Sequence, residues 1–272
     1  MSPETEAYQA YLKLLRDELV PAMGCTEPIS VAYAAAVGRD LLGAVPDRVE
    51  VVVSGNILKN VKSVIVPNTG GQKGIAVAVA AGILGGKAEK KLEVIAEVTR
   101  QQQEAIGMYL KQTPVLVSAS DSSYIFDIFL TLRREDSWAR VRIVKFHTNV
   151  VYLEKDGTVL RDVLADNPPD CEDEDGETAF GSVREILDFV EAVDLDEVKD
   201  LLERQIQYNM AVAGEGMRHS YGANIGKVLL SMYGADSVKI RAQAYAAAGS
   251  DARMGGCELP VVIVSGSGNQ GM

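Results

Sequence analysis

Two stretches near the end of the sequence carry polar groups that could bind a small charged ligand. The first is the glycine-rich loop of residues 265–271 (SGSGNQG), which follows the apolar run of residues 261–264. Glycines in such a loop permit positive φ angles, and its successive backbone N–H groups can bind an anion. The second stretch, residues 249–256, is also small and polar and contains Asp251 and Arg253. Because the stretches flank one apolar run, the sequence predicts two walls of one site, with a flexible glycine-rich tail as the alternative.

The same loop satisfies the pattern G-x-G-x-x-G through Gly266, Gly268 and Gly271. In dinucleotide-binding proteins this fingerprint follows a strand, opens a helix and precedes an acidic residue about 20 positions later. The sequence stops at Met272, so neither the helix nor the acidic residue can be checked. A dinucleotide-dependent oxidoreductase is therefore an alternative that rests on the glycine pattern alone.

Cys25 lies just before a predicted helix of residues 29–42. Thr26 is the predicted N-cap of this helix, and Pro28 falls in its first turn. The positive end of the helix dipole would stabilise a Cys25 thiolate, which is the form that binds a metal or an iron–sulfur cluster. The alternative is a small buried hydrophobic residue, the usual role of a free cysteine.

Two residues are candidates for a general base. Lys59 follows a predicted strand of residues 48–54 and would act as a base only if it were desolvated. A surface salt bridge is the more common role of a lysine. His147 is one of 2 histidines and lies where two predicted strands meet. A hydrogen-bonded structural histidine is the alternative for this position.

Hydrophobic periodicity predicts an α+β fold, with a mixed or antiparallel sheet block and a mainly helical part. Residues alternate with a period of two over 126–132 and 139–143, and Asp156-Gly157 is a strong signal for a further hairpin. Helical spacing predicts helices over residues 4–19, 29–42, 72–84, 182–193, 195–213, 222–232 and 238–248, and one or two helices over residues 88–111.

These patterns suggest a division into two domains. Residues 45–166 are predicted to form the sheet-containing domain, and residues 1–44 together with residues 178–272 the mainly helical one. The acidic, proline-containing stretch of residues 167–177 is the predicted linker. Cys171 lies in this stretch beside acidic residues that disfavour its thiolate, so we expect it to be exposed and unligated.

Composition narrows the class of protein. Hydrophobic residues make up 47% of the sequence, enough to bury a sizeable core, so a disordered chain is excluded. The net charge of −11 argues against nucleic acid or a membrane as a partner. The 3 cysteines include no C-x-x-C pair, and the start of the sequence lacks a signal peptide. We therefore expect a cytoplasmic protein that acts on a small molecule.

Short motifs along the whole chain resemble the L-cysteine desulfidase family, which is related to the α-type domain of iron–sulfur L-serine dehydratases. They are residues 21–29 (PAMGCTEPI), 56–60 (NILKN), 66–70 (VPNTG), 147–149 (HTN), 250–256 (SDARMGG) and the loop of residues 265–271. Their matching order makes the resemblance more specific than any single motif. The resemblance implies a lyase that converts L-cysteine and water to pyruvate, ammonia and sulfide without pyridoxal phosphate.

The resemblance also implies a [4Fe–4S] cluster held by three cysteines, whose open iron acts as a Lewis acid for the leaving thiolate. Cys25 matches a cluster position of the family, whereas Cys257 matches none. Either Lys59 or His147 is expected to take the Cα proton of the substrate. The residues expected to contact the small amino-acid substrate are Asn56, Asn149, Arg253, Ser265, Ser267, Asn269 and Gln270.

One departure from the family affects the expected activity. Family members continue well past the Gly-Asn-Gln-Gly loop, and the other cluster cysteines lie there. We therefore expect a partial chain that works with a further C-terminal region or subunit. Such a chain would expose an apolar face and associate, as a homo-oligomer or with the missing part. L-serine dehydratase-like activity and a non-catalytic binding or assembly subunit remain alternatives.

Overall fold

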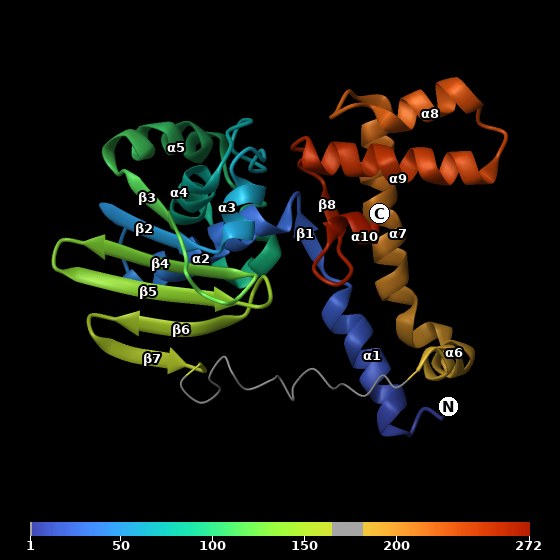
Figure 1. Cartoon of the computed structure of the whole chain (residues 1–272), viewed down its shortest axis with the longest axis horizontal. Helices are drawn as coiled ribbons and strands as arrows, with labels where there is room; N and C mark the ends of the chain where they lie inside the picture. The colour runs from blue at the N-terminus through green and yellow to red at the C-terminus, as the bar shows by residue number, and fades with distance from the viewer. Residues whose placement is uncertain (1, 165–181) are drawn as a thin grey trace.

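The computed structural model describes residues 2–164 and 182–272 (Figure 1). It contains a six-stranded mixed sheet with helices, a group of further helices, and a two-stranded antiparallel sheet. The predicted α+β fold class is confirmed. The predicted linker of residues 167–177, including Cys171, lies outside the described residues.

The six-stranded sheet has the strand order β3-β2-β4-β5-β6-β7. Strands β2 and β3 are parallel, and every other neighbouring pair is antiparallel. The predicted hairpins are confirmed, with Asp156 and Gly157 in the turn between β6 and β7. The strands are β2 (Arg48–Val53), β3 (Val115–Ala119), β4 (Asp127–Arg134), β5 (Ser137–Val144), β6 (Val150–Lys155) and β7 (Thr158–Asp162).

Alternation along β5 shows how the sheet divides into two faces. Ala139, Val141 and Ile143 are fully buried, whereas the intervening Arg140 and Arg142 are only half-buried. Successive strand residues point to opposite faces, so the apolar set packs against helices and the arginines line the other face. Those helices are α2 (Thr26–Leu42), α3 (Gly55–Val61), α4 (Ile75–Gly85), the 3₁₀ helix η1 (Ala88–Glu93) and α5 (Arg100–Gln112).

Helix α2 is the central helix of this core. It contacts α4 on one side and strands β4 and β5 on the other. At Gly82 of α4 an added Cβ would lie 2.1 Å from the carbonyl oxygen of Ala32, so only glycine permits this close crossing. The predicted division grouped residues 1–44 with the helical part, but α2 packs on the sheet.

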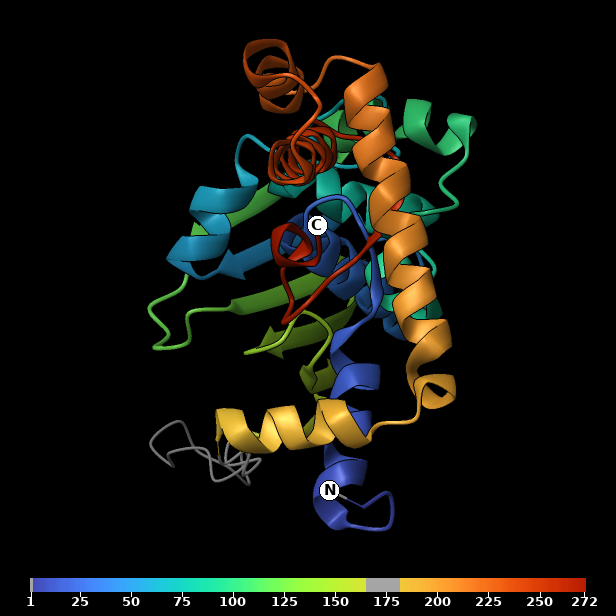
Figure 2. The same ribbon diagram turned by 90° about the vertical axis from the view of Figure 1, so that its right-hand side faces the viewer.

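The remaining helices form the second part of the molecule (Figures 1 and 2). The long helix α7 packs against α9, and an added Cβ at Gly216 would lie 2.1 Å from the carbonyl oxygen of Ala248. Small residues thus bring these helices close together. The helices are α1 (Glu6–Glu18), α6 (Val183–Ala192), α7 (Leu195–Arg218), α8 (Ile225–Tyr233) and α9 (Val238–Met254). Among the described helices, none has both the length and the apolar character needed to cross a membrane.

Two short strands join the beginning and the end of the chain. Strand β1 (Pro21–Met23) pairs antiparallel with β8 (Pro260–Val262), and helix α10 (Gly268–Gly271) follows soon after. The buried Asn209 of α7 holds β8, since its amide exchanges hydrogen bonds of 2.8 and 3.1 Å with the backbone of Val262. This pairing brings the chain segment after β8 next to the start of α2.

The structure contradicts the dinucleotide-binding alternative. That fingerprint requires a strand of a parallel sheet followed by a helix that opens at the glycines. Here β8 pairs with β1 in a two-stranded antiparallel sheet and does not belong to a parallel one. Gly266 instead lies in a tight turn, in which Val264 and Ser267 exchange backbone hydrogen bonds.

Candidate functional site

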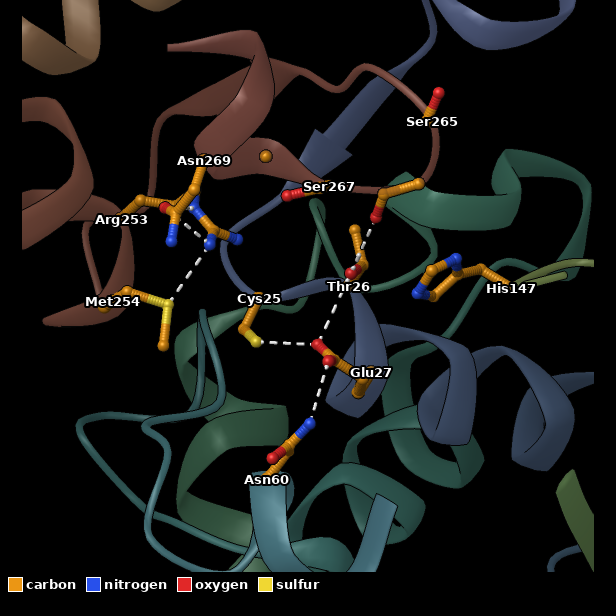
Figure 3. Close-up of a pocket in the computed structure, with 12 residues that line it drawn as sticks. Cys25, Thr26, Glu27, Asn60, His147, Arg253, Met254, Ser265, Ser267 and Asn269 are labelled. Atoms are coloured by element: carbon orange, nitrogen blue, oxygen red, sulfur yellow. Dashed lines mark hydrogen bonds between the residues drawn. The ribbon is translucent and has the colours of Figure 1, made fainter. Parts of the chain in front are cut away.

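A pocket of about 500 Å³ lies where four parts of the chain meet (Figure 3). These parts are the start of α2, the loop between β5 and β6, the end of α9, and the turn between β8 and α10. The end of α3 adds Asn60. The lining residues are Cys25, Thr26, Glu27, Asn60, His147, Arg253, Met254, Ser265, Gly266, Ser267, Gly268 and Asn269.

Cys25 is the N-cap residue of α2, so this helix begins earlier than the sequence pattern predicts. The side chain is 6% exposed, and its thiol donates a hydrogen bond of 2.9 Å to Oε2 of Glu27. Burial, followed by the negative charge of Glu27, raises the pKa of Cys25 to about 12. Burial and the Glu27 carboxylate thus act against the thiolate expected at this helix N-terminus, and the ligand role of Cys25 stays a prediction.

Glu27 is a pocket residue that the sequence interpretation missed. Burial acts to raise the pKa of its carboxyl group. Hydrogen bonds from the Cys25 thiol, its own backbone amide and Asn60, together with the charge of His147, outweigh burial and lower that pKa. The carboxylate is thus ionised and faces the pocket. An acidic residue in the first turn of a helix after a cysteine was the available signal.

His147 lies in the loop between β5 and β6, as the sequence predicts. Its ring makes an edge-to-face contact with Phe126, with ring centroids 4.7 Å apart. On its other side it meets the turn at Gly266, where an added Cβ would lie 2.9 Å from Cε1 of His147. Burial lowers the pKa of His147, and the nearby Glu27 charge opposes this effect. A neutral imidazole at the pocket can accept a proton.

Arg253 is a buried cation at the opposite end of the pocket from His147 (Figure 3). It lies in the last turn of α9, which ends at Met254 and so extends beyond the predicted helix of residues 238–248. Its guanidinium donates to Oδ1 of Asn269 at 2.8 and 3.1 Å and to the carbonyl oxygen of Gly24 at 2.9 Å. Asp251, two residues earlier, accepts a hydrogen bond of 3.0 Å from the backbone N–H of Ile225 at the start of α8.

The turn after β8 contributes backbone and hydroxyl groups to the pocket. Gly266 has a φ angle of +70°, as expected for a glycine of this loop, and Ser265 has a φ angle of +47°, which the sequence did not predict. The Thr26 hydroxyl donates to the carbonyl oxygen of Gly266 at 3.2 Å, which ties the turn to α2. Ser267 caps α10 by accepting from the backbone N–H of Gln270.

The structure brings together some of the predicted site residues and separates others. Cys25, His147, Arg253, Ser265, Ser267 and Asn269 line the pocket. Lys59, Asn56 and Gln270 are exposed and lie outside the lining, and the Asn149 amide donates to the carbonyl oxygen of Val144 at 3.1 Å. Their roles remain predictions. Asn60, Thr26 and Met254 join Glu27 as lining residues that the sequence interpretation missed.

The described residues do not provide a ligand set for a [4Fe–4S] cluster. Among residues 2–164 and 182–272, no group of three His, Cys, Asp or Glu side chains could hold a metal. Cys25 lines the pocket, whereas Cys257 is buried beside Tyr221 and is not among the lining residues. A cluster with three cysteine ligands therefore does not fit the described part of this chain by itself.

Comparison with known proteins finds relatives that are longer than this chain. A UPF0597 protein of Desulfitobacterium hafniense is 52% identical over 100% of this chain and 63% of its own length. UPF0597 proteins of Lachnoclostridium phytofermentans and Treponema denticola are 46% and 40% identical, over 97% and 100% of this chain and 63% and 64% of their own lengths. The chain thus spans a little under two thirds of these relatives.

Among solved structures, none matches the chain. The family model described as serine dehydratase alpha chain matches residues 89–272. This match covers more than half of the sequence and includes His147, Arg253 and the turn after β8. The chain belongs to the serine dehydratase alpha chain family.

Proposed function

We propose that this chain is the larger part of a lyase that eliminates the β-substituent of a small α-amino acid. One observation carries this proposal: an ionised carboxylate, a neutral imidazole and a buried guanidinium face a single pocket of about 500 Å³. An elimination from an amino acid needs a base for the Cα proton and charged groups that orient the substrate. Membership of the serine dehydratase alpha chain family supports the same reaction type.

His147 is the proposed general base of this reaction. Its half-buried, neutral ring lines the pocket, whereas Lys59 is exposed on α3 and does not. His147 takes the Cα proton, and the Cβ–X bond breaks with its electron pair leaving on sulfur or oxygen, which then gains a proton. The resulting 2-aminoacrylate tautomerises to an imine, and water hydrolyses it to pyruvate and ammonia.

We propose L-cysteine as the substrate, with sulfide as the third product, and L-serine as the second candidate. The resemblance to L-cysteine desulfidases favours L-cysteine, and the family description favours L-serine. The enzyme is proposed to work in the cytoplasm. An iron–sulfur cluster, when bound, would act as a Lewis acid for the leaving group. Cys25 is the one thiol of the described pocket, so further ligands would have to come from another part of the protein.

The test compares this chain with a version extended to the full length of its relatives, both treated anaerobically with iron and sulfide. We expect the extended protein to form pyruvate from L-cysteine or L-serine, and His147→Asn to slow this by roughly a hundredfold to ten-thousandfold. Iron and sulfide contents show whether the shorter chain holds a stoichiometric cluster, which we do not expect. A folded, cluster-containing extended protein that forms no pyruvate from either amino acid contradicts the proposed function.

A non-catalytic binding or assembly subunit is the second candidate, because the described residues lack a complete ligand set. It predicts a different outcome for the same experiment. The pocket would bind the amino acid, and neither form of the protein would produce pyruvate. Binding and turnover measured on the same preparations therefore separate the two functions.

A further inference from the structure

Arg253 carries a positive charge for which the described residues provide no negative partner. Its side chain is 6% exposed. Its four hydrogen bonds end on neutral acceptors, namely Asn269 Oδ1, the Gly24 carbonyl oxygen and Met254 Sδ. No ion pair to this guanidinium forms within the described part of the chain. A buried charge costs free energy unless it is paired. An anion bound in the pocket would therefore stabilise the Arg253 guanidinium.

The other pocket residues do not supply that anion. The Glu27 carboxylate accepts hydrogen bonds from the Cys25 thiol and from Asn60. The thiol of Cys25 donates a hydrogen bond of 2.9 Å to Glu27, so it is not the anion that pairs with Arg253. Figure 3 shows Arg253 and Asn269 above the pocket and Glu27 below it, with Cys25 between them. A cation and an anion therefore face the same cavity from two sides.

This charge arrangement selects among possible ligands. A guanidinium has five N–H donors, and the four hydrogen bonds above leave one of them for a charge-assisted hydrogen bond to a carboxylate. A phosphate group is disfavoured, because the Glu27 carboxylate would repel its second charge. An α-amino acid places a carboxylate and an ammonium on the same carbon, so one molecule can meet both Arg253 and Glu27.

We propose that Arg253 anchors the α-carboxylate of the substrate, and that Asn269 makes this possible by holding the guanidinium without neutralising it. Asn269 is thus a specificity-determining residue, because an aspartate there would satisfy the cation internally. Glu27 receives the ammonium of the same substrate. The inference rests on the proposed function for the identity of the substrate, but its test needs binding alone.

The test uses L-alanine and L-alaninamide as probes of the chain as it exists, with binding measured by calorimetry. L-alanine has no leaving group, so its binding is independent of turnover, and L-alaninamide differs only in lacking the carboxylate. We expect L-alanine to bind at least about tenfold more tightly than L-alaninamide, the effect of one charge-assisted hydrogen bond. Equal affinities, or no binding of L-alanine by the folded chain, overturn the inference.

Asn269→Asp is the decisive variant because it replaces the amide NH2 group by a carboxylate oxygen and keeps the shape of the side chain. It should weaken L-alanine binding at least about tenfold without lowering the melting temperature, since Arg253 gains a partner. Gln243→Glu is the matched control: it adds the same charge to an exposed residue of α9 that lies outside the pocket lining. L-alanine binding by Asn269→Asp at the affinity of the unmodified chain contradicts the inference.

These outcomes separate the inference from the proposed function. Carboxylate-dependent binding without pyruvate formation in the extended protein would keep the anchor and reject the lyase. Pyruvate formation that is unchanged in Asn269→Asp would keep the lyase and reject the anchor.

Discussion

At the scale of single residues, the environment of His147 makes a pH-dependent contribution to stability. Burial lowers its pKa below the unfolded value, which lies near 6.5. Between the folded and unfolded pKa values, the unfolded chain binds more protons than the folded chain at this position. The free energy of unfolding therefore rises with pH in this window, and the stabilisation is lost as pH falls through it.

We expect the free energy of unfolding to fall between pH 7 and pH 5 by more in the unmodified chain than in His147→Asn. Urea unfolding at a series of pH values measures this difference. His219→Asn is the control, because this histidine is 64% exposed. Identical pH profiles for the unmodified chain and His147→Asn would show that burial does not perturb this imidazole.

The pocket residues show which site features the sequence can predict. Cys25, His147 and Arg253 belong to types with distinctive chemistry, and all three line the pocket. Glu27 and Asn60 were missed because carboxylates and amides are common on protein surfaces. Their significance depends on the fold, which places Asn60 of α3 3.4 Å from Glu27.

At the scale of secondary-structure elements, the crossing of α2 and α4 depends on a glycine. An added Cβ at Gly82 would lie 2.1 Å from the Ala32 carbonyl oxygen, and both helices are buried there. Gly82→Ala should therefore force the helices apart and destabilise the chain by about 1–3 kcal/mol. Urea unfolding measures the change.

Gly107 provides the matched control for this substitution. It also lies within a helix, α5, but an added Cβ there meets nothing within 4 Å. Gly107→Ala should be neutral or stabilising by about 0.5–1 kcal/mol, because alanine has the higher helix propensity. Equal effects of the two substitutions would mean that the α2–α4 crossing is not tightly packed.

The elements that the sequence predicted correctly have long, regular patterns. The antiparallel hairpins and the helices α1 and α7 are examples. Strand β1 was missed because 3 residues are too few to show a period of two. The parallel pairing of β3 with β2 was also not predicted. Alternation of apolar and polar residues shows which face of a strand is buried, but it does not show the direction of the neighbouring strand.

At the scale of the whole molecule, the pocket forms because distant parts of the chain meet. Pairing of β1 with β8 places the turn at Gly266 beside Thr26, although these residues are 240 positions apart in the sequence. No local pattern specifies such a contact, so sequence motifs identified the segments but not their geometry. Disruption of the β1–β8 pairing should therefore separate Cys25 from Arg253 and abolish the pocket.

The helical part exposes two apolar stripes that predict association. On α6 the stripe consists of Val183, Leu187 and Val190, which are 74%, 52% and 61% exposed. On α7 it consists of Leu202, Ile206 and Met210, which are 38%, 61% and 53% exposed. Residues at spacings of three and four share one helix face, so each stripe is continuous. Contiguous exposed apolar residues are typical of surfaces that bind another protein.

A second copy of the chain is the expected occupant when the chain is purified alone, because the longer relatives have additional chain that could cover such stripes. Sedimentation analysis over a range of concentrations should show a dimer that Ile206→Glu shifts to monomer, since a charge buried against apolar surface is unfavourable. Gln207→Glu is the control: the neighbouring residue is exposed but lies off the stripe. A chain that stays monomeric at every concentration, or equal effects of the two substitutions, would exclude the α7 stripe as the association surface.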